Sequence, residues 1–273
     1  MKNKYITATI LALATGPASG LAQDMKPAPR LVVNITIDQL RTDYLESFES
    51  LYGNTGFRKL LHDGLLYSNT LYPFAPVDRA SAIAAQSTGT SPCYNGITAE
   101  QWFDKTTLRS VSCVDDTAFK GLLTSEGVSA KNVMTTTLSD ELKIGTKGKA
   151  FIYSIAERKD AAVIPAGHNA DGAFWVNSRE NCWCTSTYYS KKAPKWLENY
   201  NLYNTPYKKN SDINEQITDL ALKCISANSM GKDDATDLLL ISYNASPSIN
   251  KNGYEDCKET YLQLDKYLGR IIT

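Results

Sequence analysis

Histidine is scarce in this chain: among 273 residues only two are histidines, His62 and His168. A hydrolytic site built on two zinc ions takes much of its ligand set from imidazole nitrogens. The shortage therefore argues against a complete two-zinc centre in this sequence. His62 follows two leucines in a short amphipathic stretch and is most simply a surface side chain.

The chain also lacks an excess of either charge and lacks long apolar runs. Lys and Arg number 29, as do Asp and Glu. Removal of Lys2 and Lys4 with a leader leaves 27 basic against 29 acidic residues, a formal charge of −2. This balance gives no basis for binding nucleic acid or an anionic membrane. No segment beyond the leader is apolar for long enough to span a bilayer. We therefore expect no nucleic-acid partner and no membrane partner.

The first residues have the pattern of a secretory leader. Lys2 and Lys4 are followed by an apolar run over residues 6–14 and by small residues up to Ala22. An anchor helix is the alternative, but glycine and proline interrupt a run that is already short for a bilayer of roughly 30 Å. We predict a signal peptide over residues 1–22, cleaved after Ala22, and a secreted or periplasmic protein.

After the leader we predict a Pro-rich linker over residues 23–30 and one α/β domain over residues 31–273. Continuous apolar runs at residues 31–38, 150–155 and 237–243 predict buried strands. Helical spacing recurs between these runs. Strands that alternate with helices favour a mostly parallel sheet with helices on both faces.

Weaker patterns fill the spaces between these strands. Residues 65–71 alternate loosely and predict a further strand. Helical spacing predicts helices over residues 44–52, 57–62, 80–87, 138–142, 191–201, 213–230 and 261–268.

Six cysteines follow the predicted leader. An even number in an exported chain permits disulfides, but six cysteines allow fifteen connectivities and the spacing selects none. Cys93 and Cys113 enclose a short segment of the chain and are the first candidate pair. Cys182 and Cys184 are too close for an easy mutual bridge, so we expect either partners elsewhere or two buried thiols.

Asp38 ends the first predicted strand. In open α/β sheets, ligands gather at the carboxyl ends of the strands, and a carboxylate held there is a rigid, hard metal ligand. We therefore predict Asp38 as a metal ligand. A helix N-cap or a structural carboxylate is the alternative.

Four stretches together resemble the alkaline phosphatase superfamily. The resemblance runs from residue 31 to the C-terminus and is strongest to the phosphate-irrepressible branch, near the type I phosphodiesterase/nucleotide pyrophosphatases. The most specific stretch reads Pro-Ala-Gly-His-Asn, followed by Gly-Ala-Phe-Trp. The resemblance implies a zinc-dependent phosphoric ester hydrolase with an alkaline-phosphatase-like α/β core, incomplete at the C-terminus. The stretches are residues 37–44, 87–89 with 96–97, 165–169 with 172–175, and 259–265.

The resemblance implies two zinc ions, one of them bound by Asp38, and a Thr or Ser nucleophile before the Ala-rich helix. Arg79 falls in the nucleophile position. An arginine side chain has only hydrogen-bond donors and cannot attack phosphorus. Ser81 could replace it only if the loop shifts, and is otherwise a residue of the helix start.

The substrate-binding positions implied by the resemblance also depart from the family. Glu100 falls where an asparagine contacts phosphate, and its negative charge would repel a phosphoryl oxygen. A Lys-x-Arg phosphate clamp falls on Arg158, Lys159 and Asp160. Arg158 keeps the first cation, an acid replaces the second, and a local shift could bring Lys159 into reach.

The remaining zinc ligands implied by the resemblance are missing. Pro247 and Lys251 fall in two ligand positions, and an Asp-His pair and a distant His belong to a half of the fold beyond Thr273. We therefore expect that the two zinc ions of the family are not fully bound here.

Three hypotheses remain for function. The chain is a degenerate, inactive phosphatase relative, a hydrolase whose C-terminal half is truncated or supplied by another chain, or a secreted non-catalytic binding module on the same scaffold. Independent changes at Arg79, Glu100, Pro247 and Lys251 favour degeneracy over truncation alone. The expected partners are a phosphate ester or phosphate-like small molecule and a chain that supplies the C-terminal half.

Overall fold

The computed structural model describes residues 27–207, 212–249 and 255–273. The predicted leader and Lys251 lie outside these residues, so export stays a prediction. Among the described helices, none combines the length and the apolar character needed to cross a bilayer.

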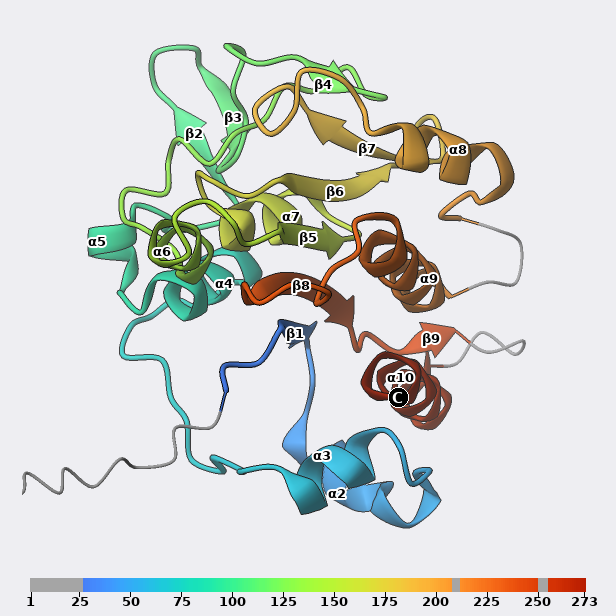
Figure 1. Ribbon diagram of the computed structural model, residues 1–273. Helices are drawn as coiled ribbons and strands as arrows, with labels where there is room; N and C mark the ends of the chain where they lie inside the picture. The colour runs from blue at the N-terminus through green and yellow to red at the C-terminus, as the bar shows by residue number, and fades with distance from the viewer. Residues whose placement is uncertain (1–26, 208–211, 250–254) are drawn as a thin grey trace, which may run out of the picture.

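A six-stranded sheet forms the centre of the fold, in the order β1-β8-β5-β6-β7-β4 (Figure 1). The strands β1, β8, β5 and β6 run parallel to one another, whereas β7 is antiparallel to both of its neighbours, β6 and β4. The expectation of a mostly parallel α/β sheet is confirmed, including the strands predicted at residues 31–38, 150–155 and 237–243. The strands are β1 (Leu31–Asp38), β4 (Gly121–Leu122), β5 (Ile152–Ala156), β6 (Gly172–Asn177), β7 (Cys182–Ser186) and β8 (Asp237–Asn244).

Helices cover both faces of this sheet, and two small antiparallel pairs lie outside it. The pairs are β2 (Gln101–Asp104) with β3 (Arg109–Ser112), and β9 (Ser248–Ile249) with β10 (Glu255–Asp256). The helices are α2 (Thr42–Ser47), the 3-10 turn η1 (Glu49–Leu51), α3 (Phe57–Asp63), α4 (Arg79–Thr88), α5 (Pro92–Asn95), α6 (Leu138–Gly145), α7 (Lys159–Ala166), α8 (Lys195–Tyr203), α9 (Ile213–Ala227) and α10 (Cys257–Ile272).

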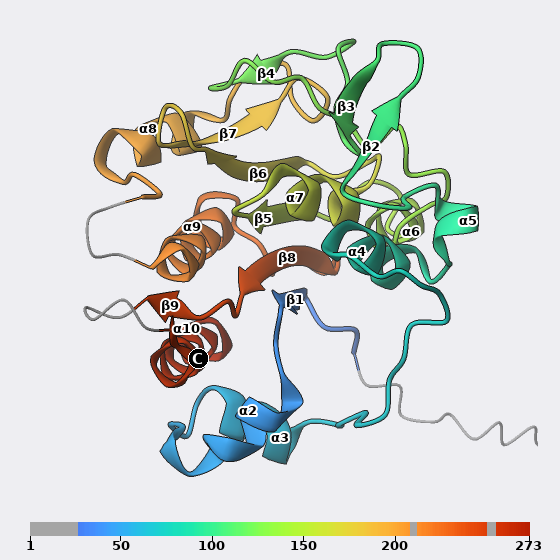
Figure 2. The ribbon, with the colours of Figure 1, turned by 180° about the vertical axis from the view of Figure 1, so that it is seen from behind.

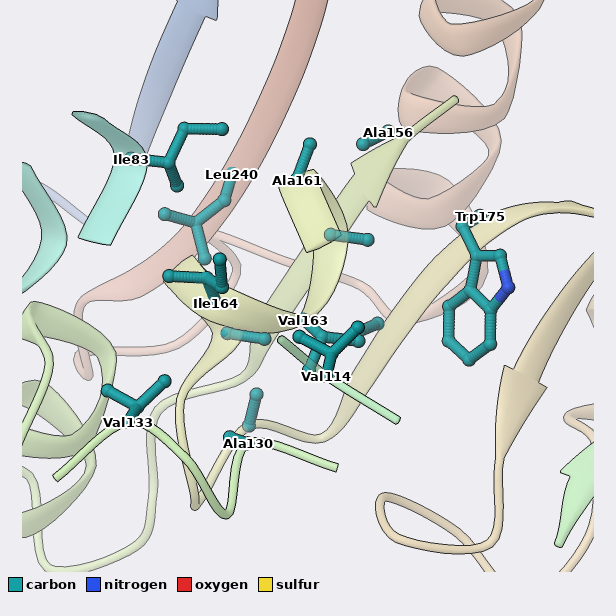
Figure 3. Close-up of a cluster of buried hydrophobic side chains, with 14 of the residues drawn as sticks. Ile83, Val114, Ala130, Val133, Ala156, Ala161, Val163, Ile164, Trp175 and Leu240 are labelled. Carbon is teal, nitrogen blue, oxygen red and sulfur yellow. The ribbon is translucent and has the colours of Figure 1, made fainter. Parts of the chain in front are cut away.

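Successive residues of β8 serve two different cores. Leu238 and Leu240 pack into a cluster with α4 and α7, part of which Figure 3 shows around Leu240. Leu239 and Ile241 pack on the other face, with α9 and α10. Figure 2 shows α4 and α7 from the side opposite to the view of Figure 1. Burial on both faces explains why this strand is a continuous apolar run.

The strand predicted at residues 65–71 is wrong. Those residues form no strand and run between α3 and α4 outside β1 in both views (Figure 2). Leu65 is 78% exposed and Leu71 is 83% exposed. In the described part of the chain these residues pair with no strand, and β1 is the edge strand of the sheet. The helix expected over residues 44–52 is also divided, into α2 and η1.

The candidate disulfide between Cys93 and Cys113 is wrong, because all six cysteines are free thiols. Cys93 is exposed in α5, with its Sγ 3.1 Å from the Oγ of Ser91, whereas Cys113 is buried in a core cluster. Of the other candidate thiols, Cys184 is buried and Cys182 is partly exposed. Burial raises the pKa of the Cys113 thiol to about 12, which makes it unreactive at neutral pH.

Candidate functional site

Two of the predicted site residues, Asp38 and Arg158, lie at the carboxyl ends of β1 and β5. Asp38 is the last residue of β1 and is in register with Asn244 of β8. Arg158 follows β5 and is the N-cap residue of α7. This is the edge at which open α/β sheets place their ligands.

Asp78 places two members of the site. It is the N-cap of α4, and its Oδ1 accepts a 2.8 Å hydrogen bond from the Ser81 backbone N–H. Its Oδ2 accepts a 2.6 Å hydrogen bond from the Glu100 backbone N–H. Although burial opposes the charge, these bonds hold the pKa of Asp78 below its usual value. One carboxylate thus fixes both Arg79, the first residue of α4, and Glu100.

The Arg79 guanidinium contacts three carboxylates from three separate parts of the chain. Its Nε donates a 3.0 Å hydrogen bond to Asp160 Oδ2. Its Nη2 lies 2.6 Å from Glu100 Oε2 without hydrogen-bond geometry, so this is a charge contact. Its Nη1 lies 3.7 Å from Asp38 Oδ2. Burial disfavours the arginine charge, but Asp160, Glu100 and Asp38 more than offset it and raise the pKa of Arg79.

Arg158 completes this group, which we call the Arg79 cluster: Asp38, Arg79, Glu100, Arg158 and Asp160. Arg158 Nη2 donates a hydrogen bond to Glu100, and its Nε lies 3.7 Å from Asp160 Oδ1. Two guanidinium groups therefore face three carboxylates, a formal charge of −1. An excess of negative charge at this edge disfavours binding of a phosphate group.

Two other candidates have different partners. The Ser81 hydroxyl is buried, donates to the Asp78 carbonyl at 3.1 Å and accepts from the Asp78 N–H at 3.0 Å. Lys159 donates to Asp115 at 2.6 Å and to Glu126 at 3.0 Å. Ser81 therefore takes part in the cap of α4. Among the described residues, the ion pairs of Lys159 are with Asp115 and Glu126, outside the Arg79 cluster.

The residues present do not fit a two-zinc site. No group of three or more His, Cys, Asp and Glu side chains in the described part of the chain is arranged to hold a metal ion. The one predicted ligand, Asp38, faces a guanidinium cation rather than other ligands. Pro247, which the resemblance puts in a ligand position, offers no side-chain donor.

Sequence reasoning missed two acids of this site. The resemblance accounts for Asp160 only as an acid in the place of a phosphate-binding cation. In the structure, Asp160 accepts the hydrogen bond from Arg79 Nε. From the sequence, Asp78 was assigned no role in the site. A signal for its capping role was available, because Asp78 and Ser81 have the spacing of a capping box.

The stretch of residues 165–169, the most specific part of the family resemblance, surrounds the buried carboxylate of Asp140. Asp140 in α6 accepts hydrogen bonds from the backbone N–H groups of His168 (2.8 Å) and Asn169 (3.0 Å). The His168 ring lies between two acceptors, with Nδ1 3.0 Å from Asp140 Oδ2 and Nε2 3.0 Å from the Val133 carbonyl. Only the doubly protonated imidazolium donates to both acceptors. His168 therefore has a structural role.

We expect His168 to titrate above the usual histidine value of about 6.5. The hydrogen bond to Asp140 raises its pKa, against the opposing effect of burial. Because its pKa is higher in the folded than in the unfolded state, His168 stabilises the fold fully at a pH below its unfolded-state pKa. This contribution is lost as the pH rises through its folded-state pKa. An NMR titration, with His168→Gln to assign the ring signal, measures the shift. A midpoint at or below the usual value would show that the imidazolium is not favoured.

The sheet order and the site at its carboxyl edge define an α/β protein of alkaline-phosphatase-like fold. A family described as type I phosphodiesterase / nucleotide pyrophosphatase matches residues 32–273. The chain therefore belongs to this family.

Its relatives include alkaline phosphatases. The sequence is 38% identical to alkaline phosphatase PhoV of Synechococcus elongatus over 183 residues, which is 66% of this chain and 33% of PhoV. It is 29% identical to alkaline phosphatase PafA of Elizabethkingia meningoseptica over 304 residues, 89% of this chain and 56% of PafA. The chain thus spans between a third and just over half of these relatives.

Solved structures agree with this assignment. The crystal structure of wild-type PafA matches with a TM-score of 0.77 and 27% identity, over 89% of this chain and 59% of that chain. A phosphonoacetate hydrolase from Sinorhizobium meliloti matches with a TM-score of 0.55 and 11% identity, over 89% and 53% of the two chains. The second likeness concerns the fold alone.

Proposed function

We propose that this chain is a non-catalytic member of the family. In it, a cluster of guanidinium and carboxylate groups takes the place of a nucleophile and metal ions. The observation that carries the proposal is the Arg79 guanidinium in contact with Asp38, Glu100 and Asp160. A protonated guanidinium has no free lone pair with which to attack phosphorus, so we assign no covalent role to the residue in the nucleophile position.

The same cluster supports the absence of tightly bound zinc. A zinc ion at Asp38 would have to displace, or be repelled by, the Arg79 guanidinium, which is only 17% exposed. The carboxylates that could attract a cation already neutralise Arg79 and Arg158. The charge of the site is therefore balanced mainly from within the chain, and the site lacks imidazole ligands.

The competing function is that of an active phosphoric ester hydrolase, which the names of the alkaline phosphatase relatives favour. Assays with aryl phosphate mono- and diesters in the presence of added zinc distinguish the two. We expect no turnover above that of zinc and buffer alone. Turnover that disappears in Ser81→Ala would establish Ser81 as the nucleophile and reject the non-catalytic proposal.

We also propose that further polypeptide covers the open side of β1. Three observations support this proposal. The chain spans 59% of the PafA chain, β1 is the edge strand of the described sheet, and apolar side chains of residues 65–72 are exposed. Exposed apolar stretches and unpaired strand edges promote association. We therefore expect the chain on its own to self-associate or to need a partner.

Replacement of Leu65 and Leu71 by lysine tests this expectation. Because both side chains are exposed, we expect the double variant to associate less, with a melting temperature within a few degrees of the original. Size-exclusion chromatography with light scattering and a thermal melt measure the two properties. Leu202→Lys is the matched control, since Leu202 in α8 is 72% exposed at a different place. An original chain that is already a clean monomer with a sharp melt would contradict the proposal.

A further inference from the structure

A cleft of about 550 Å³ opens next to the Arg79 cluster and shares Arg158 and Asp160 with it. It is bounded by the loop of residues 123–126, the turn from β5 to α7, the hairpin between β6 and β7, and Tyr207. Its volume is within the roughly 300–1,000 Å³ of small-molecule sites. It also lies at the carboxyl ends of the parallel strands β5 and β6, where α/β proteins bind ligands.

The walls of the cleft carry both charges in nearly equal number. The cations are Arg158, Lys159 and Arg179, and the acids are Glu126, Glu157, Asp160 and Glu180. The formal charge of the walls is −1. A phosphate or a polyanion would therefore meet net repulsion. The mixture of donors and acceptors along the walls matches a ligand that both donates and accepts hydrogen bonds.

Internal contacts keep several of these groups in place. Lys159 donates to Glu126 at 3.0 Å, and the Tyr207 hydroxyl donates to Glu157 Oε1 at 2.8 Å. The Tyr207 backbone N–H is itself held by Asn181 at 2.8 Å. In contrast, no ion pair within the described residues involves Arg179 or Glu180, which line the cleft from the hairpin. Their side chains are the ones most available to a ligand.

We propose that this cleft binds a neutral, hydroxyl-rich small molecule of the saccharide class. Each hydroxyl group both donates and accepts hydrogen bonds, so it can satisfy carboxylates and guanidinium groups alike without adding charge. The partly exposed Tyr207 supplies an aromatic surface for the apolar face of a sugar ring. The site goes beyond the proposed loss of catalysis and does not depend on it, because none of its steps requires a nucleophile or a metal.

Isothermal titration calorimetry and NMR titration of the purified chain test the proposal. The probes are glucose, galactose, N-acetylglucosamine and lactose, with inorganic phosphate as the charged comparison. We expect saturable binding of at least one sugar and no competition from phosphate. Glu180→Ala should weaken that binding about tenfold through the loss of a charged hydrogen-bond acceptor.

Glu141→Ala is the matched control, because Glu141 is an exposed acid on α6 that does not line the cleft. We expect it to leave sugar affinity unchanged. A thermal melt of Glu180→Ala establishes that the variant is folded. Failure of all four sugars to bind overturns the proposal, as does displacement of a bound sugar by phosphate or equal affinity of the Glu180→Ala variant and the original chain.

Discussion

Arg79→Met is expected to lower the free energy of unfolding by about 3–5 kcal/mol, the usual cost of removing one partner from a buried charge group. The Arg79 side chain is 17% exposed, and its loss leaves three carboxylates facing one remaining guanidinium. Asp160 is the most affected, because it is buried and loses its aligned hydrogen bond. Urea unfolding of the two proteins, with equal slopes, measures the difference.

Two further variants separate the charge effect from loss of packing. Arg158→Met removes a cation of the same cluster whose side chain is 49% exposed, so we expect a loss of no more than about 1 kcal/mol. Adding Asp160→Asn to Arg79→Met removes the buried charge that was left without its partner and should recover part of the loss. Equal losses for Arg79→Met and Arg158→Met, with no recovery, would show that the cluster does not stabilise the fold through charge.

The strands that pack on both faces could be predicted from the sequence. In β8, the continuous run from Leu238 to Ile241 contributes alternate residues to two cores, so a hydrophobic residue is needed at every position. The run at residues 65–71 shows the limit of this reasoning. Its alternation fits a strand, but a strand also needs a neighbour, and a local pattern does not tell whether one is present.

The family resemblance put Asp38, Arg79, Glu100 and Arg158 at site positions, and the structure places these four side chains in contact. The role of each in a functional site stays a prediction. That these side chains neutralise one another depends on how three separate chain segments meet in space, which spacing along the sequence does not determine. The buried position of Asp160 was missed for the same reason. The capping role of Asp78, in contrast, follows from the local spacing of Asp78 and Ser81 in the sequence.

Zinc binding is where we expect the largest difference from a two-metal hydrolase. A tetrahedral zinc site needs three or four donors within about 2.0–2.3 Å of the ion. Asp38 supplies one carboxylate, and the Arg79 guanidinium lies 3.7 Å from it. No larger set of metal-ligating side chains exists in the part of the chain that the structure describes. One carboxylate beside a guanidinium does not compete with water for the ion.

The zinc content of the purified chain tests the central claim most directly. The protein is incubated with excess zinc, dialysed against zinc-free buffer and measured by mass spectrometry, together with Asp38→Asn. Because thiols that solvent reaches, those of Cys93, Cys182 and Cys257, are potential zinc ligands, the comparison of the two proteins isolates the metal held at Asp38. We expect well under one equivalent per chain and the same content in both proteins. Two equivalents per chain, reduced by Asp38→Asn, would contradict the account.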